Sequence, residues 1–206
     1  MKARPLPALC RALALVLALG CQAVLPKSER SDFFVLTALE PAPVASGASA
    51  PSVLLGPVVL PAYLDRRELV TRLGSNQLRA EDLELWAEPL RDSLSRTLER
   101  DLTALLGAGR VQRLPWTAPS PPELAVAVEL RRFEKTSSGR AELEAHWTIS
   151  EGRGATELVR RETRLSLPAG ASTQAAVASL SQALVTLSRE IAAAVQGLGA
   201  RSAVAD

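Results

Sequence analysis

The strongest constraint on the fold is an alternation of apolar and polar residues between residues 124 and 167. A period of two is typical of a strand that buries one face and exposes the other to water. Residues 124–135, 140–151 and 156–167 all alternate, which predicts an antiparallel meander with one wet face. The middle segment alternates best, with Ala141, Leu143, Ala145, Trp147 and Ile149 on one face and Glu142, Glu144, His146 and Thr148 on the other.

Two other segments repeat apolar residues every three or four positions, which predicts amphipathic helices. The first should begin between Asp82 and Pro89, because proline suits a first helical turn. The second should span residues 172–198. Glycines should end both helices, Gly107 and Gly109 in the first and Gly197 and Gly199 in the second. The apolar faces comprise Trp86, Leu90, Leu94, Leu98, Leu102 and Leu105, and then Val177, Leu180, Leu184, Leu187, Ile191, Ala194, Val195 and Leu198.

The remaining strands are shorter. Residues 52–60 form an apolar run that Gly56-Pro57 interrupts, which predicts an edge strand or a bulge, because proline cannot donate to a ladder. The expected fold is α+β, a mainly antiparallel sheet with two long helices packed on one face as a two-layer sandwich. A single domain should cover residues 32–199, followed by a frayed tail at 200–206. The other expected strands are 33–37, a hairpin of 68–73 and 77–80 around Gly74-Ser75-Asn76, and 110–116.

Residues 1–20 have the features of a secretory signal. A basic start is followed by an uncharged run, residues 13–20, which is too short to span a bilayer. The run ends at Gly20-Cys21, which resembles a bacterial lipobox and predicts lipidation of Cys21, with a tether at residues 21–31. Gln22 favours the outer membrane, since an aspartate there would indicate inner-membrane retention. An ordinary signal peptide with a stray cysteine, or lipidation at Cys10, are the alternatives.

Composition excludes several classes of function. Removing residues 1–20 takes away three of the 24 basic residues, so the net charge falls from +2 to about −1 and nothing favours a polyanion partner. Only seven residues are aromatic, which argues against a nucleic-acid stacking platform. One histidine and two cysteines leave too few ligands for a structural zinc site.

Enzyme motifs are also missing from the sequence. His146 is the only candidate for proton transfer near neutral pH, and its place on the wet strand face makes a solvated histidine the simpler interpretation. No G-x-S-x-G nucleophile motif or glycine-rich phosphate loop is present. Trp86, Trp116 and Trp147 could line a lipid cleft, but core packing is favoured. We therefore expect no catalytic residue, no metal and no cofactor.

Several segments together resemble a known family, the PqiC/YmbA-type auxiliary lipoproteins of ABC-type and MCE (mammalian cell entry) transport systems. The resemblance covers nearly all of the chain after the signal, in the family's order. It implies a non-enzymatic lipoprotein on the periplasmic face of the outer membrane, whose partner is the MCE-domain subunit of a lipid transport system. The matching segments are Pro61–Arg66 (PAYLDR), Val70–Leu78 (VTRLGSNQL), Trp86–Leu90 (WAEPL), Val111–Trp116, Phe133-Glu134, Leu143–Trp147 and Leu180–Ile191.

A partner-binding patch is expected at Tyr63, Leu64, Asp65 and Arg66, because tyrosine and arginine are enriched at interface hot spots. The alternative is that Tyr63 and Leu64 only plug the end of the sheet, with ordinary ion pairs in the turn. The runner-up function is a periplasmic lipid carrier or chaperone that itself holds an acyl chain. Formation of homo-oligomers is left open.

Overall fold

The three longest strands are those that the alternation predicts. They are β6 (Leu124–Thr136), β7 (Arg140–Glu151) and β8 (Glu157–Pro168), joined as an antiparallel meander. Along β7 every second residue is buried, from Ala141 to Ile149, while His146 and its neighbours on the other face are partly exposed. This part of the prediction is confirmed. The structure, a computed structural model, describes residues 30–40, 50–113, 121–152 and 156–205, so that Cys21 and Trp116 lie outside the described residues.

The sheet as a whole is mixed, and the expectation of a mainly antiparallel sheet is wrong. The described residues form eight strands, and four of the seven strand pairings are parallel: β1–β4, β2–β5, β2–β6 and β3–β6. The long ladders of β7 are antiparallel, but α2 returns the chain across the sheet, so that β5 and β6 run parallel to β2. The order is β1-β4-β3-β6-β2-β5, with β7 and β8 beyond β6, and the other strands are β1 (Asp32–Phe34), β2 (Val53–Val59), β3 (Glu68–Gly74), β4 (Gln77–Trp86) and β5 (Val111–Arg113).

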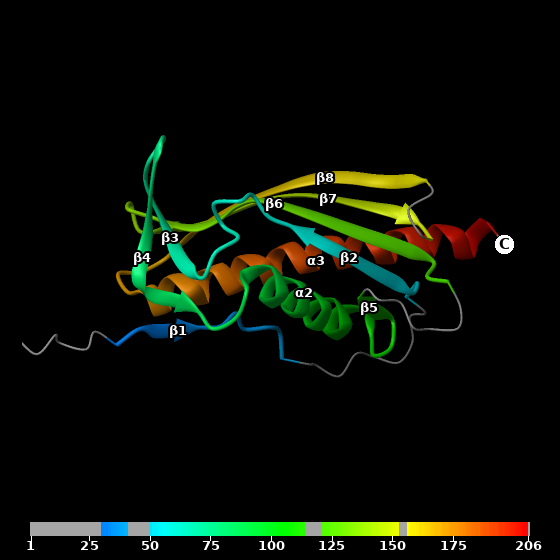
Figure 1. Cartoon of the computed structure of the whole chain (residues 1–206). Coiled ribbons are helices and arrows are strands. Elements are labelled where there is room, and N and C mark those ends of the chain that lie inside the picture. Colours follow the sequence, from blue (N-terminus) through cyan, green and yellow to red (C-terminus); the bar gives the residue numbers. More distant parts are fainter. Residues whose placement is uncertain (1–29, 41–49, 114–120, 153–155, 206) are drawn as a thin grey trace, which may run out of the picture. The chain divides into compact units, whose positions relative to one another are not determined.

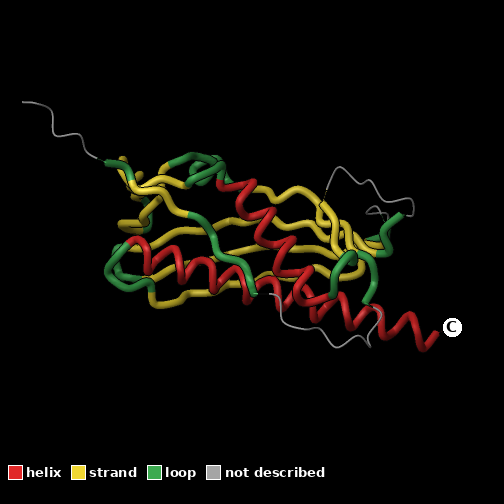
Figure 2. Tube along the Cα trace, turned by 90° about the horizontal axis from the view of Figure 1, so that it is seen from below, coloured by secondary structure: helices red, strands yellow, loops and turns green. Residues whose placement is uncertain are grey.

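Both helices cover one face of this sheet and pack against each other, as expected for a two-layer α+β domain (Figure 1). They are α2 (Leu90–Leu106) and α3 (Thr173–Ala205). In the view from below, the two helices cross in front of the strands (Figure 2). No helix in the described part of the chain combines the length and apolarity needed to span a bilayer.

The start of α2 differs from the expectation. Residues 82–86 belong to strand β4, and the helix begins only after Pro89, its N-cap. Trp86 therefore does not lie on the helical face. It ends β4 and packs beside Phe133, with 6.4 Å between ring centroids. Its helical spacing to Leu90 was coincidental, since strand and helix periods overlap over a few residues. The end of α2 is as predicted, with Gly107 at a φ of 107°.

The end of α3 also differs, since the helix continues to Ala205 and includes most of the expected tail. Gly197 and Gly199 lie inside it. A Cβ on Gly199 would lie 2.7 Å from the Pro51 ring, so this glycine permits the close approach of another segment. Gly199 is thus not a helix end but a position where the absence of a side chain permits close packing.

Strand β2 is bulged at Gly56-Pro57, between Leu55 and Val58, as predicted. It is not an edge strand, because β5 and β6 pair with it on its two sides. Glycine is required beside the proline, since a Cβ on Gly56 would lie only 3.2 Å from the carbonyl oxygen of Val126. Because the bulge interrupts the ladder at Pro57, this strand tolerates a residue without a backbone N–H inside the sheet.

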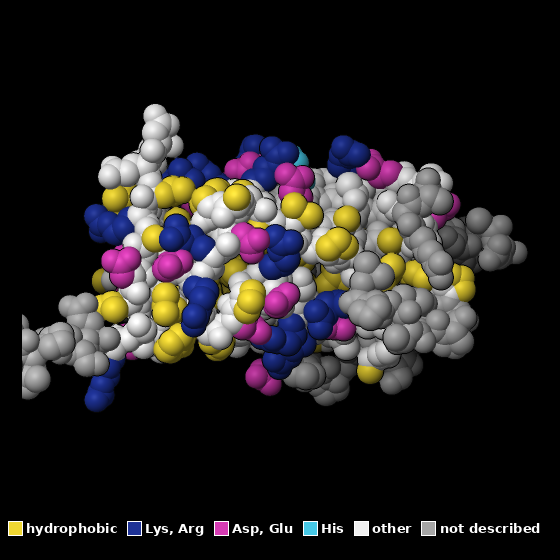
Figure 3. All heavy atoms as spheres, in the orientation of Figure 1, with side chains coloured by type: hydrophobic (Ala, Val, Ile, Leu, Met, Phe, Trp, Pro, Cys, Tyr) yellow, Lys and Arg dark blue, Asp and Glu magenta, His cyan; other side chains and the backbone are white. Residues whose placement is uncertain are grey.

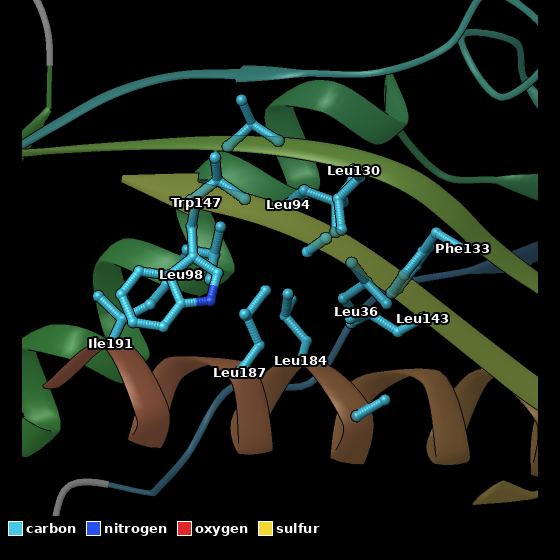
Figure 4. Packing of buried hydrophobic residues seen from close by; sticks show 14 of the residues in the cluster. Leu36, Leu94, Leu98, Leu130, Phe133, Leu143, Trp147, Leu184, Leu187 and Ile191 are labelled. Carbon is cyan, nitrogen blue, oxygen red and sulfur yellow. The ribbon is translucent and has the colours of Figure 1, made fainter. Parts of the chain in front are cut away.

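The hydrophobic core lies between the sheet and the two helices (Figure 4). Leu94 and Leu98 have no exposed surface, as their helical spacing predicts. Trp147 is 1% exposed, and its indole N–H donates to Thr163 Oγ1 at 3.0 Å. Core packing of Trp86 and Trp147 is therefore confirmed. The side chains that meet in Figure 4 are Leu36, Leu94, Leu98, Leu130, Phe133, Leu143, Trp147, Leu184, Leu187 and Ile191.

Candidate functional site

The loop at residues 61–67 joins β2 to β3 and carries the four residues expected to bind a partner. Two backbone hydrogen bonds fold it tightly, from Leu64 N–H to the Pro61 carbonyl (3.0 Å) and from Arg66 N–H to the Leu64 carbonyl (2.8 Å). Leu64 is 2% exposed and belongs to the core, whereas Asp65 and Arg66 are exposed. The loop thus combines a buried anchor with an exposed charged tip, and partner binding by that tip stays a prediction.

The charged tip is paired at the surface. Asp65 Oδ2 lies 2.6 Å from Arg91 Nη2 of α2, and Arg66 Nε lies 2.9 Å from Glu68 Oε2 of β3. Exposed pairs of this kind contribute about 0–1 kcal/mol. The loop tip could therefore exchange these ion pairs for contacts with a partner at little cost in stability.

Beneath the loop, Tyr63, Arg72 and Glu134 form a polar cluster that sequence reasoning missed. Glu134 is 1% exposed and is paired with Arg72 of β3, while its Oε2 has no hydrogen-bond partner among the described residues. The Tyr63 hydroxyl donates to the Arg131 carbonyl at 3.0 Å. Burial, and then the Glu134 carboxylate, raise the pKa of Tyr63, so its hydroxyl keeps its proton at neutral pH. One feature of the sequence could have indicated this cluster, because Glu134 directly follows Phe133, a buried residue of the same strand.

His146 lies on the open face of the sheet, as predicted. Its Nε2 is 3.5 Å from Glu162 Oε1 of β8, and with Glu144 these residues could offer three metal ligands. However, Arg164 pairs with both carboxylates, at 3.8 Å from Glu144. The ion pairs with Arg164 give both carboxylates a role without a metal, and the expectation that the chain holds no metal stays a prediction.

A groove of about 890 Å³ opens between β1 and the first turns of α3. Lys135 lies within it, with its Nζ 3.2 Å from Glu84 Oε2 and 2.9 Å from Thr173 Oγ1. Phe33 and Val35 line the groove and are each 57% exposed. No pattern in the sequence indicates this groove, because its walls come from four segments that are distant along the chain.

The segment after β1 is fastened to both helices. Thr37 N–H donates to Ser181 Oγ of α3 at 3.1 Å, and Leu39 N–H donates to Asp101 Oδ1 of α2 at 2.7 Å. Ser188 Oγ of α3 donates to the other Asp101 oxygen at 3.0 Å. Burial raises the pKa of Asp101, although these hydrogen bonds oppose the shift. The sequence contains an indication of this buried carboxylate, since Asp101 lies three residues after Leu98 and therefore on the apolar face of the helix.

Residues 34–192 match the family model of the ABC-type transport auxiliary lipoprotein component. The chain belongs to this family. The resemblance to PqiC/YmbA-type proteins inferred from the sequence segments is thus confirmed. The auxiliary lipoprotein family associates with ABC-type transport systems, as its name says, and its members are lipoproteins. No curated protein matches the chain.

Solved structures share the fold. Protein XCC0632 from Xanthomonas campestris, assigned to the DUF330 family, matches with a TM-score of 0.68 at 18% identity over 84% of this chain and 99% of that one. An uncharacterized protein matches with a TM-score of 0.67 at 21% identity over 81% of this chain and 99% of that one. At these identities the likeness concerns the fold alone.

Proposed function

We propose that this auxiliary lipoprotein is anchored in the outer membrane through Cys21 and docks the MCE-domain subunit of a lipid transport system from the periplasmic side. The observation that carries the proposal is the fastening of residues 37 and 39 to Ser181 and Asp101. The tether enters through β1, which pairs with β4, and these bonds then join the following residues to both helices, so the domain suits a protein that holds a partner in place. The proposed role is non-enzymatic and needs no cofactor.

The alternative function, a carrier that holds an acyl chain, has the groove beside β1 as its best candidate site. An acyl chain there would remove the Lys135–Glu84 ion pair from water, and the cost of desolvating two charges can exceed what their pairing returns. Docking is therefore preferred. Native mass spectrometry of the domain produced without its lipid anchor separates the two functions, because only a carrier would then retain lipid after purification.

The docking surface is proposed at the exposed tip of the loop, Asp65 and Arg66. Asp65→Ala with Arg66→Ala should weaken pull-down of the MCE-domain subunit several-fold and leave the melting temperature close to that of the wild type. The control is Glu157→Ala with Arg160→Ala, which removes another exposed ion pair, at 2.5 Å on β8. Equal binding by both double variants would place the docking surface elsewhere.

A second variant tests the non-enzymatic role. His146→Ala should leave transport-dependent envelope integrity unchanged, since His146 lies on the open face of the sheet, with its Nε2 3.5 Å from Glu162 Oε1. Loss of integrity with the fold intact would show that the histidine has a chemical role.

A further inference from the structure

Exposed apolar side chains concentrate on one pair of strands. Of the six large hydrophobic residues that are exposed in the described part of the chain, four lie on β1, directly after it or on β4. Surface hydrophobes are ordinary when scattered, but a group on neighbouring strands marks a contact surface. The four are Phe33 (57% exposed), Val35 (57%), Leu78 (38%) and Leu83 (37%), and the other two are Val59 and Leu158.

These strands are neighbours in space. Asp32 pairs with Glu84 and Phe34 with Trp86, so that β1 lies along the end of β4. Figure 3 shows hydrophobic side chains among basic and acidic ones at the end of the molecule that carries β1 and the β3–β4 hairpin. We name the four residues on these strands the β1–β4 apolar surface.

The chain outside the domain indicates what this surface meets. Ten peptide steps separate Cys21 from Ser31, the residue before β1. Even fully extended, they span at most about 36 Å. A lipid on Cys21 would thus keep β1 close to the bilayer at a high effective concentration, where a weak contact is enough to bind.

We propose that the β1–β4 apolar surface docks onto the bilayer that holds the lipid anchor, giving the domain a second contact with the membrane. The inference rests on the Cys21 anchor of the proposed function. It orients the domain, because a tether alone leaves it free to turn. The loop tip at Asp65 and Arg66 lies at this same end of the sheet, since Glu68 pairs with Leu85 and Leu85 with Phe33. The partner would therefore meet the domain close to the bilayer, while the other end of the sheet points into the periplasm.

The charges around the surface predict how the contact responds to lipid composition. Arg30, Arg67 and Arg79 are exposed and form no ion pair with a described residue, while Asp32 and Asp82 are exposed nearby. Because only one positive charge is left in excess, the contact depends mainly on apolar burial. It should therefore form on uncharged phosphatidylcholine and change little with salt.

Site-directed spin labelling of the lipidated protein in phosphatidylcholine nanodiscs tests the proposal. An introduced cysteine would be the only free thiol of the mature chain, since Cys10 lies in the signal and the Cys21 sulfur carries the lipid. Labels are placed at Phe33→Cys and Leu78→Cys. Leu158→Cys is the matched control, because Leu158 is 37% exposed, like Leu78 at 38%.

The control position lies far from the proposed contact. Val159 pairs with Ile149, and Ile149 with Val126, near the start of β6, whereas β3 pairs with Thr136 at its end. Ten residues of strand separate these points, about 30 Å.

The readout is the ratio of label collisions with oxygen, which concentrates in lipid, to collisions with a water-soluble nickel chelate. We expect a ratio several-fold higher at positions 33 and 78 than at position 158. Phe33→Ser with Val35→Ser should lower the ratio at position 78 and preserve the melting temperature and palmitate labelling. Val59→Ser with Leu158→Ser should leave that ratio unchanged.

Two outcomes would overturn the proposal, and they are distinguishable. If the protein is lipidated but all three labels give equal ratios, the anchor stands and the apolar surface faces something other than lipid, such as a protein partner. If no lipid is attached to Cys21 and the protein does not associate with nanodiscs, the proposed anchoring fails as well.

Discussion

Asp101 is a carboxylate without exposed surface that joins three segments of the chain: the residues after β1, helix α2 and helix α3. Burial costs its charged form more than the hydrogen bonds from Leu39 and Ser188 return, so its pKa is raised. Arg100 and Arg189 oppose the shift at longer range. The folded state therefore binds a proton at Asp101 more readily than the unfolded chain does.

The pH dependence of stability follows from this shift. A group whose pKa is higher in the folded state adds to the free energy of unfolding at low pH. This added stability is complete below the pKa of the group in the unfolded chain, about 3.9 for aspartate. It is lost as the pH rises through the pKa of the folded state. Asp101→Asn keeps an oxygen acceptor for Leu39 N–H without the charge. Urea denaturation should therefore show the wild type gaining stability relative to Asp101→Asn as the pH falls from 7 towards 4. Asp92→Asn, an exposed carboxylate on the same helix, is the control, and a constant difference for Asp101→Asn would contradict the prediction.

Glu134 is buried and pairs with Arg72, whose side chain is 17% exposed, so each residue compensates the charge of the other. Although burial works against its charge, the hydrogen bond to Glu134 raises the pKa of Arg72. Removing one partner leaves an uncompensated buried charge, which costs about 3–5 kcal/mol, whereas apolar replacement of both is often neutral. Arg72→Met should thus destabilise the protein by about that amount, and Arg72→Met with Glu134→Leu by less. Denaturation curves of these two variants and of Glu134→Leu alone decide it, and a cost of the double variant equal to the sum of the two single costs would show that the two residues act independently.

At the scale of elements, α3 shows that a glycine in a helix can have two meanings. Gly197 has open space where a Cβ would lie, whereas a Cβ on Gly199 would lie 2.7 Å from the ring of Pro51. Gly197→Ala should stabilise the protein by up to about 1 kcal/mol through helix propensity. Gly199→Ala should give no such gain and should destabilise, because the rigid proline ring cannot move aside. Thermal melting of the two variants checks this, and equal shifts would mean that the segment around Pro51 is not seated on α3.

At the scale of the whole molecule, residues 31–206 form one compact unit that contains all ten described helices and strands. The lipid anchor would attach outside this unit, at Cys21. Anchoring and folding should therefore be separable. Attachment of the lipid needs no core residue, and the domain needs no lipid in order to fold.

Lipidation is tested at that scale. Cys21→Ser should accumulate as unprocessed precursor that takes up no labelled palmitate, because the acceptor thiol is gone. Cys10→Ser should label like the wild type, which also tests the alternative lipidation site. Palmitate labelling of cells that express each variant gives the answer. Undiminished labelling of Cys21→Ser would show that the lipobox interpretation is wrong.

The sequence alone determined the features that depend on neighbours along the chain. The antiparallel ladders of β6, β7 and β8, the β3–β4 hairpin and the burial of Leu94 and Leu98 follow from local periodicity and turn residues. Each of these features depends on residues only a few positions apart, and at that spacing the geometry of the chain decides which way the side chains point. The loop tip at Asp65 and Arg66 was also accessible to sequence reasoning, because turn composition implies exposure.

Only the tertiary structure decided the features that join distant segments. The parallel pairing of β2 with β5 and β6 depends on where α2 returns the chain. The Asp101 clamp brings together residues 39, 101 and 188, and the Arg72–Glu134 pair brings together β3 and β6. Local patterns cannot specify such contacts, because an apolar stripe or an alternating strand states which face is buried and not what is buried against it.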